Sequence, residues 1–166
     1  MIVPVEKNKE YEVDIVDNGY DGEGIAKIND FTIFINGAIK GEKCKILILK
    51  INKSFAFGKL IEVIRKSEKR IESDCSTYKR CGGCSLRHIQ YEETLDMKRD
   101  MVQNLVNKTL ENKVEVNKVI GMEKPYNYRN KLQYPIGIDK KRKSSNGSVC
   151  KKNTWNNKCR KLFNSK

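Results

Sequence analysis

The alternation of apolar and polar residues predicts β structure in residues 1–64. Tyr11, Val13 and Ile15 alternate with acidic residues, which is the period of a half-buried strand. The pairs Asn29-Asp30 and Asn36-Gly37 are typical of hairpin turns. Apolar positions within 24–36, 43–51 and 55–64 indicate further strands. Five short strands at roughly ten-residue spacing predict a small closed barrel.

The pattern changes after a polar connector at 65–74. Between Tyr91 and Leu110 the apolar residues follow helical spacing with charges between them. The β-branched residues of 114–120 predict a strand, and 126–138 is expected to be a loop that enters another strand. The predicted fold class is therefore mainly β with an α+β part. Its expected divisions are a barrel at 1–64, a linker at 65–74, a segment at 75–139 with cysteines, the helix and the start of a further β domain, and a tail at 140–166.

Charge is distributed unevenly along the chain. Residues 1–139 hold 24 basic and 21 acidic residues, whereas 140–166 hold ten basic residues and no acidic one, which gives a net charge of +13. Because the body is nearly neutral, the total charge does not identify its partner. The tail has no periodicity and is rich in Lys, Asn and Ser, which predicts a disordered basic arm.

The apolar runs are too short for a membrane-spanning helix, and the first residues lack the pattern of a signal peptide. We therefore expect a cytoplasmic protein with no membrane partner. In a reducing compartment the six cysteines are expected to be metal ligands or buried thiols rather than disulfides.

Cys75, Cys81 and Cys84 have the spacing C-x5-C-x2-C, and Gly82-Gly83 separates the last two. A Cys-x2-Cys loop lets two thiolates converge on one metal, and glycines permit the tight turn. The set needs a fourth ligand. His88, the only histidine, would complete a Cys3His zinc site, whereas a distant cysteine would complete a [4Fe–4S] cluster. The spacing leaves both metals open, and three free thiols are the structural alternative.

Three segments carry motifs that together resemble a known family. GEGIAKINDFTIFINGAIKGEKCKILILKINKSFAFGKL is similar to a TRAM domain, and CSTYKRCGGCSLRHIQYEETLDMKRDMV is similar to a cluster motif with the helix behind it. YNYRNKLQYPIG is similar to the entry of a central RNA-binding domain. Over residues 1 to about 139 the chain resembles the N-terminal part of bacterial RNA (uracil-5-)-methyltransferases of the 23S rRNA type.

The resemblance implies an OB-like barrel that binds RNA and a [4Fe–4S] cluster on the three cysteines, completed by a later cysteine. This makes the cluster the favoured metal centre. It also implies a C-terminal Rossmann-like domain that binds S-adenosylmethionine, in which a cysteine adds to C6 of uracil and C5 accepts the methyl group. No motif of that domain occurs in this sequence. We therefore expect no catalytic or S-adenosylmethionine-binding residue here, and a monomeric fragment that binds 23S rRNA and is inactive alone.

Candidate RNA contacts combine basic and aromatic side chains, because bases stack on aromatic rings and cations follow phosphates. They are Lys27, Phe31, Lys40 and Lys53 in the barrel, with Phe34, Phe55 and Phe57 as further aromatic candidates, and Tyr128, Arg129 and Lys131 near the end of the similarity. The structural alternatives are that most of these phenylalanines fill the barrel, and that 126–134 is a solvated hairpin.

The alternative function is a non-catalytic RNA-binding module with a structural zinc. Colour separates the two, since a cluster makes anaerobically purified protein brown and zinc leaves it colourless. The resemblance also stops abruptly in a lysine run near Lys140. This motivates a second hypothesis, that residues 140–166 are read from a shifted frame.

Overall fold

The structure, a computed structural model, describes residues 3–76, 78–79, 83–111, 114–126 and 128, and the backbone of 136–138 and 144–146. The chain divides into two units. One contains 1–71 and 88–121, and the other contains 72–87 and 122–166. Each unit is described by itself.

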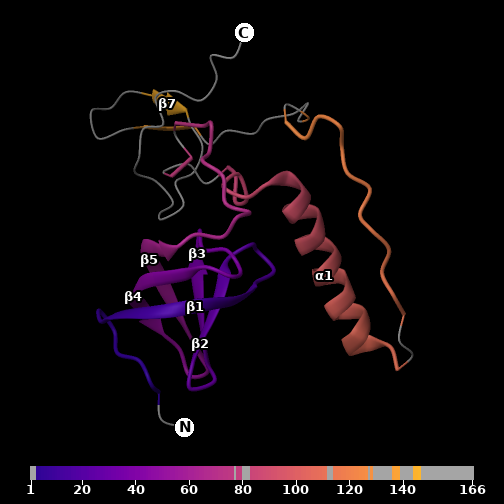
Figure 1. Ribbon diagram of the computed structural model, residues 1–166. Coiled ribbons are helices and arrows are strands. Elements are labelled where there is room, and N and C mark those ends of the chain that lie inside the picture. The colour runs from indigo at the N-terminus through magenta and orange to yellow at the C-terminus, as the bar shows by residue number, and fades with distance from the viewer. Residues whose placement is uncertain are drawn as a thin grey trace. The chain divides into compact units, whose positions relative to one another are not determined.

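Five strands of the first unit close into a barrel (Figure 1). They are β1 (Glu10–Asn18), β2 (Gly24–Ile28), β3 (Phe31–Asn36), β4 (Lys43–Ile51) and β5 (Phe55–Arg65). Their order around the barrel is β1-β2-β3-β5-β4, and β1 pairs with β4 to close it. Only β3 and β5 are parallel among the five pairs of this barrel. The predicted small closed barrel, with an OB-like strand order, is confirmed.

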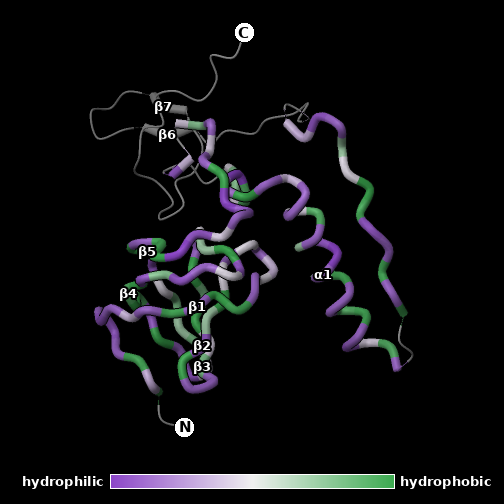
Figure 2. The backbone as a smooth tube through the Cα atoms, viewed as in Figure 1, coloured by the Kyte–Doolittle hydropathy of each residue, from purple (hydrophilic) through white to green (hydrophobic). Residues whose placement is uncertain are grey.

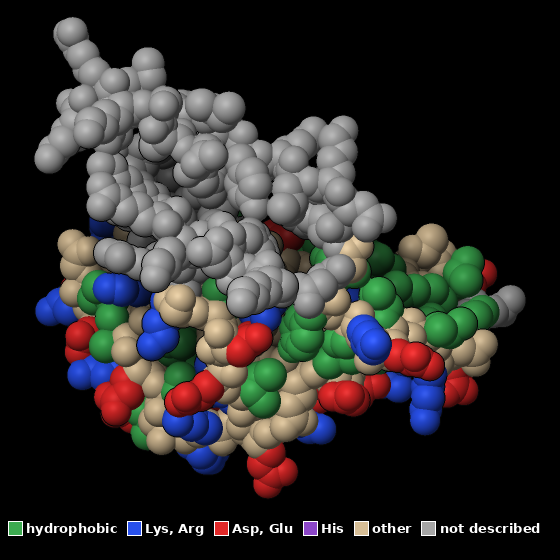
Figure 3. Space-filling view, turned by 90° about the horizontal axis from the view of Figure 1, so that it is seen from above, with side chains coloured by type: hydrophobic (Ala, Val, Ile, Leu, Met, Phe, Trp, Pro, Cys, Tyr) green, Lys and Arg blue, Asp and Glu red, His purple; other side chains and the backbone are tan. Residues whose placement is uncertain are grey.

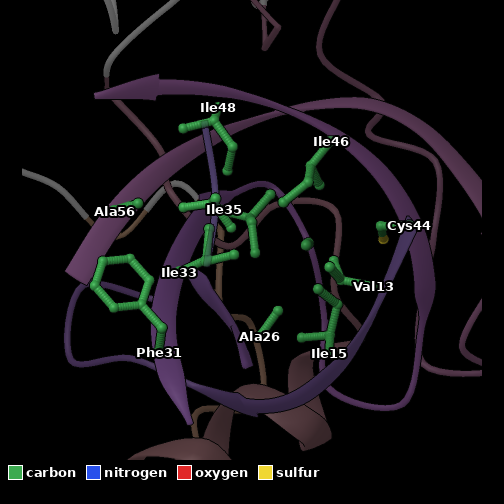
Figure 4. Packing of buried hydrophobic residues seen from close by; sticks show 12 residues of the cluster. Val13, Ile15, Ala26, Phe31, Ile33, Ile35, Cys44, Ile46, Ile48 and Ala56 are labelled. Carbon is green, nitrogen blue, oxygen red and sulfur yellow. The ribbon is translucent and has the colours of Figure 1, made fainter. Parts of the chain in front are cut away.

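The interior of the barrel is filled by alternate residues of each strand. Figure 2 shows the resulting alternation of hydrophobic and hydrophilic positions along the chain, and Figure 4 shows the interior side chains. Their fully buried isoleucines are Ile33, Ile35, Ile46 and Ile48. A Cβ on Gly58 would lie 3.2 to 3.3 Å from side-chain atoms of Ile46, Ile33 and Ile35, so glycine lets β5 lie here without displacing the core side chains.

Only one of the two predicted hairpin turns forms a hairpin. Asn29 and Asp30 have φ of 49° and 63° and connect the antiparallel strands β2 and β3. Such left-handed conformations suit Asn and Asp, whose short side chains tolerate them. The Asn36-Gly37 prediction is wrong, because β3 next pairs with β5 rather than with β4. Gly37, with φ of 83°, instead opens the loop that leads to Glu42.

Glu42 is the one carboxylate buried completely in the described part of the chain, at 0% exposure. Arg70 binds it with two hydrogen bonds, Nε to Oε1 at 2.6 Å and Nη2 to Oε2 at 2.8 Å. The backbone N–H of Ile39 donates to Oε2 at 2.9 Å, and that of Ser67 donates to Oε1 at 3.3 Å. Arg70 also donates to the carbonyl oxygen of Gly37 at 2.6 Å. The pair therefore fastens the connector onto the end of the barrel.

The hydrogen bonds to Glu42 keep it ionised. Burial by itself would raise its pKa, but the hydrogen bonds and charge of Arg70, with the N–H groups of Ile39 and Ser67, outweigh burial and place the pKa below the ordinary 4.5. The carboxylate is thus both desolvated and compensated, which is the condition under which a buried charge is tolerated.

The helix α1 (Tyr91–Thr109) lies where helical periodicity predicts it. Its start is joined to the connector, since Arg70 and Ile89 form a β-bridge and the N–H of Gln90 donates to the carbonyl of Lys69 at 2.9 Å. Among the described residues, no helix is both long enough and apolar enough to cross a membrane.

The strand predicted at 114–120 is wrong. These residues form no strand in the structure, and the Gln103 side chain bonds to their backbone instead. Its Nε2 donates to the carbonyl of Val114 at 2.8 Å, and its Oε1 accepts from the N–H of Val116 at 2.8 Å. A β-branched sequence allows extended backbone, but a strand also requires a partner.

The backbone of the second unit includes β6 (Ile136–Ile138) and β7 (Ser144–Asn146), which pair antiparallel. A strand at 136–138 agrees with the sequence pattern. The strand Ser144–Asn146 lies within the segment 140–166 that the sequence predicts to be disordered, and its backbone groups pair with those of β6. The rest of 140–166 lies outside the described residues.

We predict that Arg70→Ala destabilises the chain strongly, because Glu42 would remain buried without its counter-charge. Removing one partner of a buried pair costs about 3–5 kcal/mol of unfolding free energy. Denaturant unfolding of the full chain, followed by far-ultraviolet circular dichroism, measures this loss.

The control is Arg65→Ala, since the pair of Arg65 with Asp14 is exposed on both sides and such pairs contribute about 1 kcal/mol at most. The native contribution of Glu42 is complete above its ordinary pKa and is lost as pH falls through the lowered folded value. Without Arg70, burial raises the pKa of Glu42, so the deficit of Arg70→Ala should shrink between pH 7 and pH 4. An equal cost for both variants at every pH would contradict this account.

Candidate functional site

Two sides of the barrel's outer surface differ in the kind of side chain that they carry. On β1 and β4, lysines are matched by acids: Lys45 lies 2.8 Å from Glu10, and Lys43 lies 3.2 Å from Glu12. Arg65, at the end of β5, lies 3.1 Å from Asp14. We call this the ion-paired face. Figure 3 likewise shows acidic and basic side chains intermingled over the described part of the side it presents.

Where β3 and β5 run parallel, the outer surface carries aromatic side chains instead of ion pairs. Their inward residues are buried, so Phe34, Phe55 and Phe57 point outward. The ring of Phe57 lies 5.4 Å from that of Phe55 and 6.0 Å from that of Phe34, between centroids, and Phe34 and Phe55 are 5.6 Å apart. Two of the three contacts are edge-to-face, which aromatic rings prefer. We call these three residues the phenylalanine face.

Lysines accompany the phenylalanine face without acidic partners. Lys50 pairs with Phe57 across β4 and β5, and Lys59 follows on the same side of β5. Lys27 stands on β2 opposite Thr32, and Lys53 lies in the turn before β5. None of the four has an acidic group within 4.0 Å in the part of the chain that the structure describes.

The cysteine loop belongs to the second unit and is closed at its base. Arg87 donates to both carboxylate oxygens of Asp74, at 2.6 and 2.7 Å. Inside the loop, the N–H of Tyr78 donates to the carbonyl of Cys75 at 3.0 Å, and its hydroxyl donates to the carbonyl of Ser85 at 2.7 Å. These contacts bring the residues beside Cys75 and Cys84 together.

Arg87 also contacts the segment after α1. Its guanidinium carbon lies 4.6 Å from the centroid of the Tyr126 ring, which is cation–π geometry. The hydrogen bonds to Asp74 raise the pKa of Arg87 above its already high ordinary value, and the same contact lowers the pKa of Asp74. Arg87 is therefore a permanent cation that joins both ends of the loop to Tyr126.

The metal ligands stay predictions. Cys75 is half-buried and Cys84 is exposed, but Cys81 lies outside the described residues. His88 is buried, and its backbone carbonyl accepts from the N–H of Ile71 in the first unit. No group of three potential metal ligands is found among the described residues, a set that does not include Cys81. Cys44 is a core residue, and burial, followed by the charge of Glu42, raises its pKa to about 11.

Comparison with known proteins identifies the barrel. Residues 4–61 match the TRAM domain. The chain is 50% identical over 139 residues to a Clostridium acetobutylicum protein named uncharacterized RNA methyltransferase, which covers 82% of the chain and 30% of the relative. A Clostridium tetani protein of the same description is 49% identical over 138 residues, with 83% and 30% covered. Residues 4–61 are thus similar to a TRAM domain, and the similarity to proteins named RNA methyltransferases extends over most of the chain.

The similarities cover different shares of the chain and of the proteins it matches. The chain spans about 30% of the length of the curated relatives it matches. A conserved protein of Methanococcus maripaludis, known from a solution structure, is 41% identical with a TM-score of 0.36, and the match covers 37% of the chain and 87% of that protein.

The predicted RNA contacts differ in how exposed they are to solvent. Lys27 and Lys53 are exposed, but Lys40 lies 3.3 Å from Asp17 and is therefore already paired. Phe31 needs correction: it is 7% exposed and lies among the interior side chains (Figure 4), so its ring serves the core. Tyr128, in the second unit, is exposed, whereas Arg129 and Lys131 lie outside the described residues.

Lys50 and Lys59 are candidate RNA contacts that the sequence alone does not indicate. Only the pairing of β5 with both β3 and β4 brings these lysines beside the phenylalanines. An alternation of inward and outward residues in Phe55–Lys59 is visible in the sequence, but it does not reveal which strand lies next to it.

We predict that Arg87→Ala loosens the cysteine loop, because Asp74 and Tyr126 lose their common partner. Hydrogen exchange of peptides covering 74–87 should become roughly five- to tenfold faster. Mass spectrometry of the full chain measures this rate.

The matched control is Arg99→Ala, which removes a half-buried arginine that pairs with Asp96 and Asp100 inside α1. It should leave exchange in 74–87 unchanged. If both variants leave the loop as protected as in the native chain, the Asp74–Arg87 contact does not hold it.

Proposed function

We propose that this chain is the N-terminal, RNA-binding part of an S-adenosylmethionine-dependent methyltransferase that forms 5-methyluridine in 23S rRNA. One observation carries the proposal. The similarity to proteins named RNA methyltransferases extends over 139 residues, well beyond the TRAM domain at 4–61. The relatives thus share the cysteine-containing region as well as an RNA-binding type of barrel.

The barrel is suited to bind RNA. Small OB-like barrels bind single strands on their outer strand faces, where aromatic rings stack on bases and cations contact phosphates. The phenylalanine face and its lysines supply both groups. Tyr126 and Tyr128 are further exposed aromatic residues in the second unit.

In the proposed reaction the chain contributes RNA binding and orientation rather than bond making. S-adenosylmethionine supplies the methyl group when it is bound elsewhere in the complete enzyme. A rigid barrel limits how the RNA can lie, and correct orientation is a large part of the advantage of a bound reaction over one in solution.

We propose further that Cys75, Cys81 and Cys84 hold a [4Fe–4S] cluster. Three thiols in C-x5-C-x2-C spacing form a soft donor set, which suits iron–sulfur clusters as well as zinc. The Asp74–Arg87 contact supports the proposal, because a loop already closed at its base loses less conformational entropy when it binds a metal. The fourth ligand would be a later cysteine.

Anaerobic reconstitution of the full chain with iron and sulfide is expected to give a brown protein with broad visible absorption. Cys84→Ser should lower iron uptake by at least half, because clusters depend on every thiolate. Cys44→Ala is the control, since that thiol is buried in the barrel core. Stoichiometric zinc with no iron uptake would favour the zinc-containing RNA-binding module instead.

The methyltransferase proposal is tested with a chimera. Residues 1–139 of this chain replace the matched region of the Clostridium acetobutylicum relative. The purified chimera is incubated with S-adenosylmethionine and unmethylated 23S rRNA, and nucleosides are analysed by mass spectrometry. We expect 5-methyluridine at a rate within about tenfold of the unmodified relative, since half of the aligned residues are identical.

The unmodified relative serves as the reference. If it forms a different methylated nucleoside, the uracil-C5 assignment is wrong. If it forms 5-methyluridine while a folded chimera does not, this chain does not perform the proposed role.

A further inference from the structure

We infer that the phenylalanine face is a single-stranded RNA platform, on which Phe57 stacks against a base while Lys50 and Lys59 contact the flanking phosphates. The inference deepens the proposed function and rests on it. Of the aromatic candidates named from the sequence, it selects Phe57 and excludes the buried Phe31.

The backbone register fixes the three rings on the outside. Phe34 pairs with Phe57 across the parallel strands, and Thr32 pairs with Phe55. Their chain neighbours Ile33, Ile35, Ala56 and Gly58 are all buried. Because successive side chains of a strand point to opposite faces, none of the three rings can turn into the core without a shift of register.

Phe57 is the ring presented to solvent. It is 40% exposed, whereas Phe34 and Phe55 are half-buried. The perpendicular contact with Phe55, at 5.4 Å, and the tilted contact with Phe34, at 6.0 Å, restrain its orientation. A restrained ring loses little conformational entropy when a base stacks on it.

The charge around the rings favours a polyanion. Lys50 and Lys59 lie on two sides of Phe57 in the β4–β5 pairing. β2 and β3 contain no acidic residue, and β5 contains none before Glu62. Asp30, in the turn between β2 and β3, is the acid of that hairpin. On the ion-paired face, by contrast, Lys43 and Lys45 are already neutralised by Glu12 and Glu10.

A single strand fits this arrangement better than a duplex or a second protein. The bases of a duplex are already stacked and paired, whereas those of a single strand can leave the stack and meet an aromatic ring. A protein partner for four lysines would need an acidic surface, and Glu10 and Glu12 of the ion-paired face already pair with lysines of this chain.

The test compares variants of the full chain in binding to oligouridine at several salt concentrations. Phe57→Leu keeps the charge and the apolar bulk but removes the ring, and we expect about tenfold weaker binding. Phe57→Trp should bind as tightly as the native chain or more tightly. Lys50→Gln should reduce the salt slope of log K by about 0.7, the loss of one phosphate contact on a single strand.

The matched control for Lys50→Gln is Lys45→Gln on the same strand. Because Lys45 is ion-paired, this variant should leave both the affinity and the salt slope unchanged.

Because the basic tail is also expected to bind polyanions, an oligouridine that carries 5-iodouridine is photocrosslinked to the chain in parallel. The crosslinked residue is then located by mass spectrometry. We expect it at Phe57, with loss of the crosslink in Phe57→Leu.

The outcomes separate the inference from the proposed function. If the chain binds RNA but crosslinks lie only outside β3 and β5, and Phe57→Leu binds normally, the platform is wrong and the RNA-binding function stands. If the chain binds no RNA at low salt, both fail. Self-association that Phe57→Leu abolishes, with RNA binding unchanged, would show that this face contacts protein. Circular dichroism verifies that each variant is folded.

Discussion

The buried ion pair between Glu42 and Arg70 determines how the first unit is assembled. Glu42 can occupy an interior position only because Arg70 reaches it from the connector, 28 residues along the chain. The backbone of Arg70 in turn pairs with Ile89, two residues before α1 begins. One compensated charge thus sets the end of the barrel, the path of the connector and the starting point of the helix. Such a pair adds little net stability compared with apolar packing, but it specifies one arrangement.

A barrel fixed in this way can keep two unlike outer faces. Its inward positions are committed to a dense core of isoleucines, so every outward residue has a defined place. The outward lysines Lys43 and Lys45 of β4 lie beside acidic residues of β1. The outward positions of β3 and β5 instead hold three aromatic rings, and the lysines around these rings have no acidic partner among the described residues. Exposed aromatic patches on soluble domains commonly mark binding surfaces. In this chain the asymmetric barrel coincides with the residues that match the TRAM domain.

Structural elements that depend only on neighbouring residues in the chain were predictable from the sequence. β4 and α1 follow the periodicity of their own residues, and the Asn29-Asp30 turn follows the conformational freedom of its two residues. Features that depend on distant partners were not. The sequence of the connector indicates only a polar linker, because Glu42, the partner of Arg70, lies 28 residues away in the chain. Residues 114–120 look like a strand but find only Gln103. The phenylalanine face exists because β3 and β5 pair in parallel, which no local pattern reveals, so the sequence did not separate the buried Phe31 from the exposed Phe57 among the aromatic candidates.

The central claim is that RNA meets the barrel on the β3–β5 side and not on the ion-paired side. A nuclear magnetic resonance titration of the isotope-labelled full chain with oligouridine tests it most directly, because every strand reports separately. The account predicts shifts of the backbone amides of Phe34, Phe57 and Lys59 that saturate with RNA, while those of Glu12 and Lys45 stay in place. Saturating shifts in β1 and β4, with β3 and β5 unmoved, would contradict it.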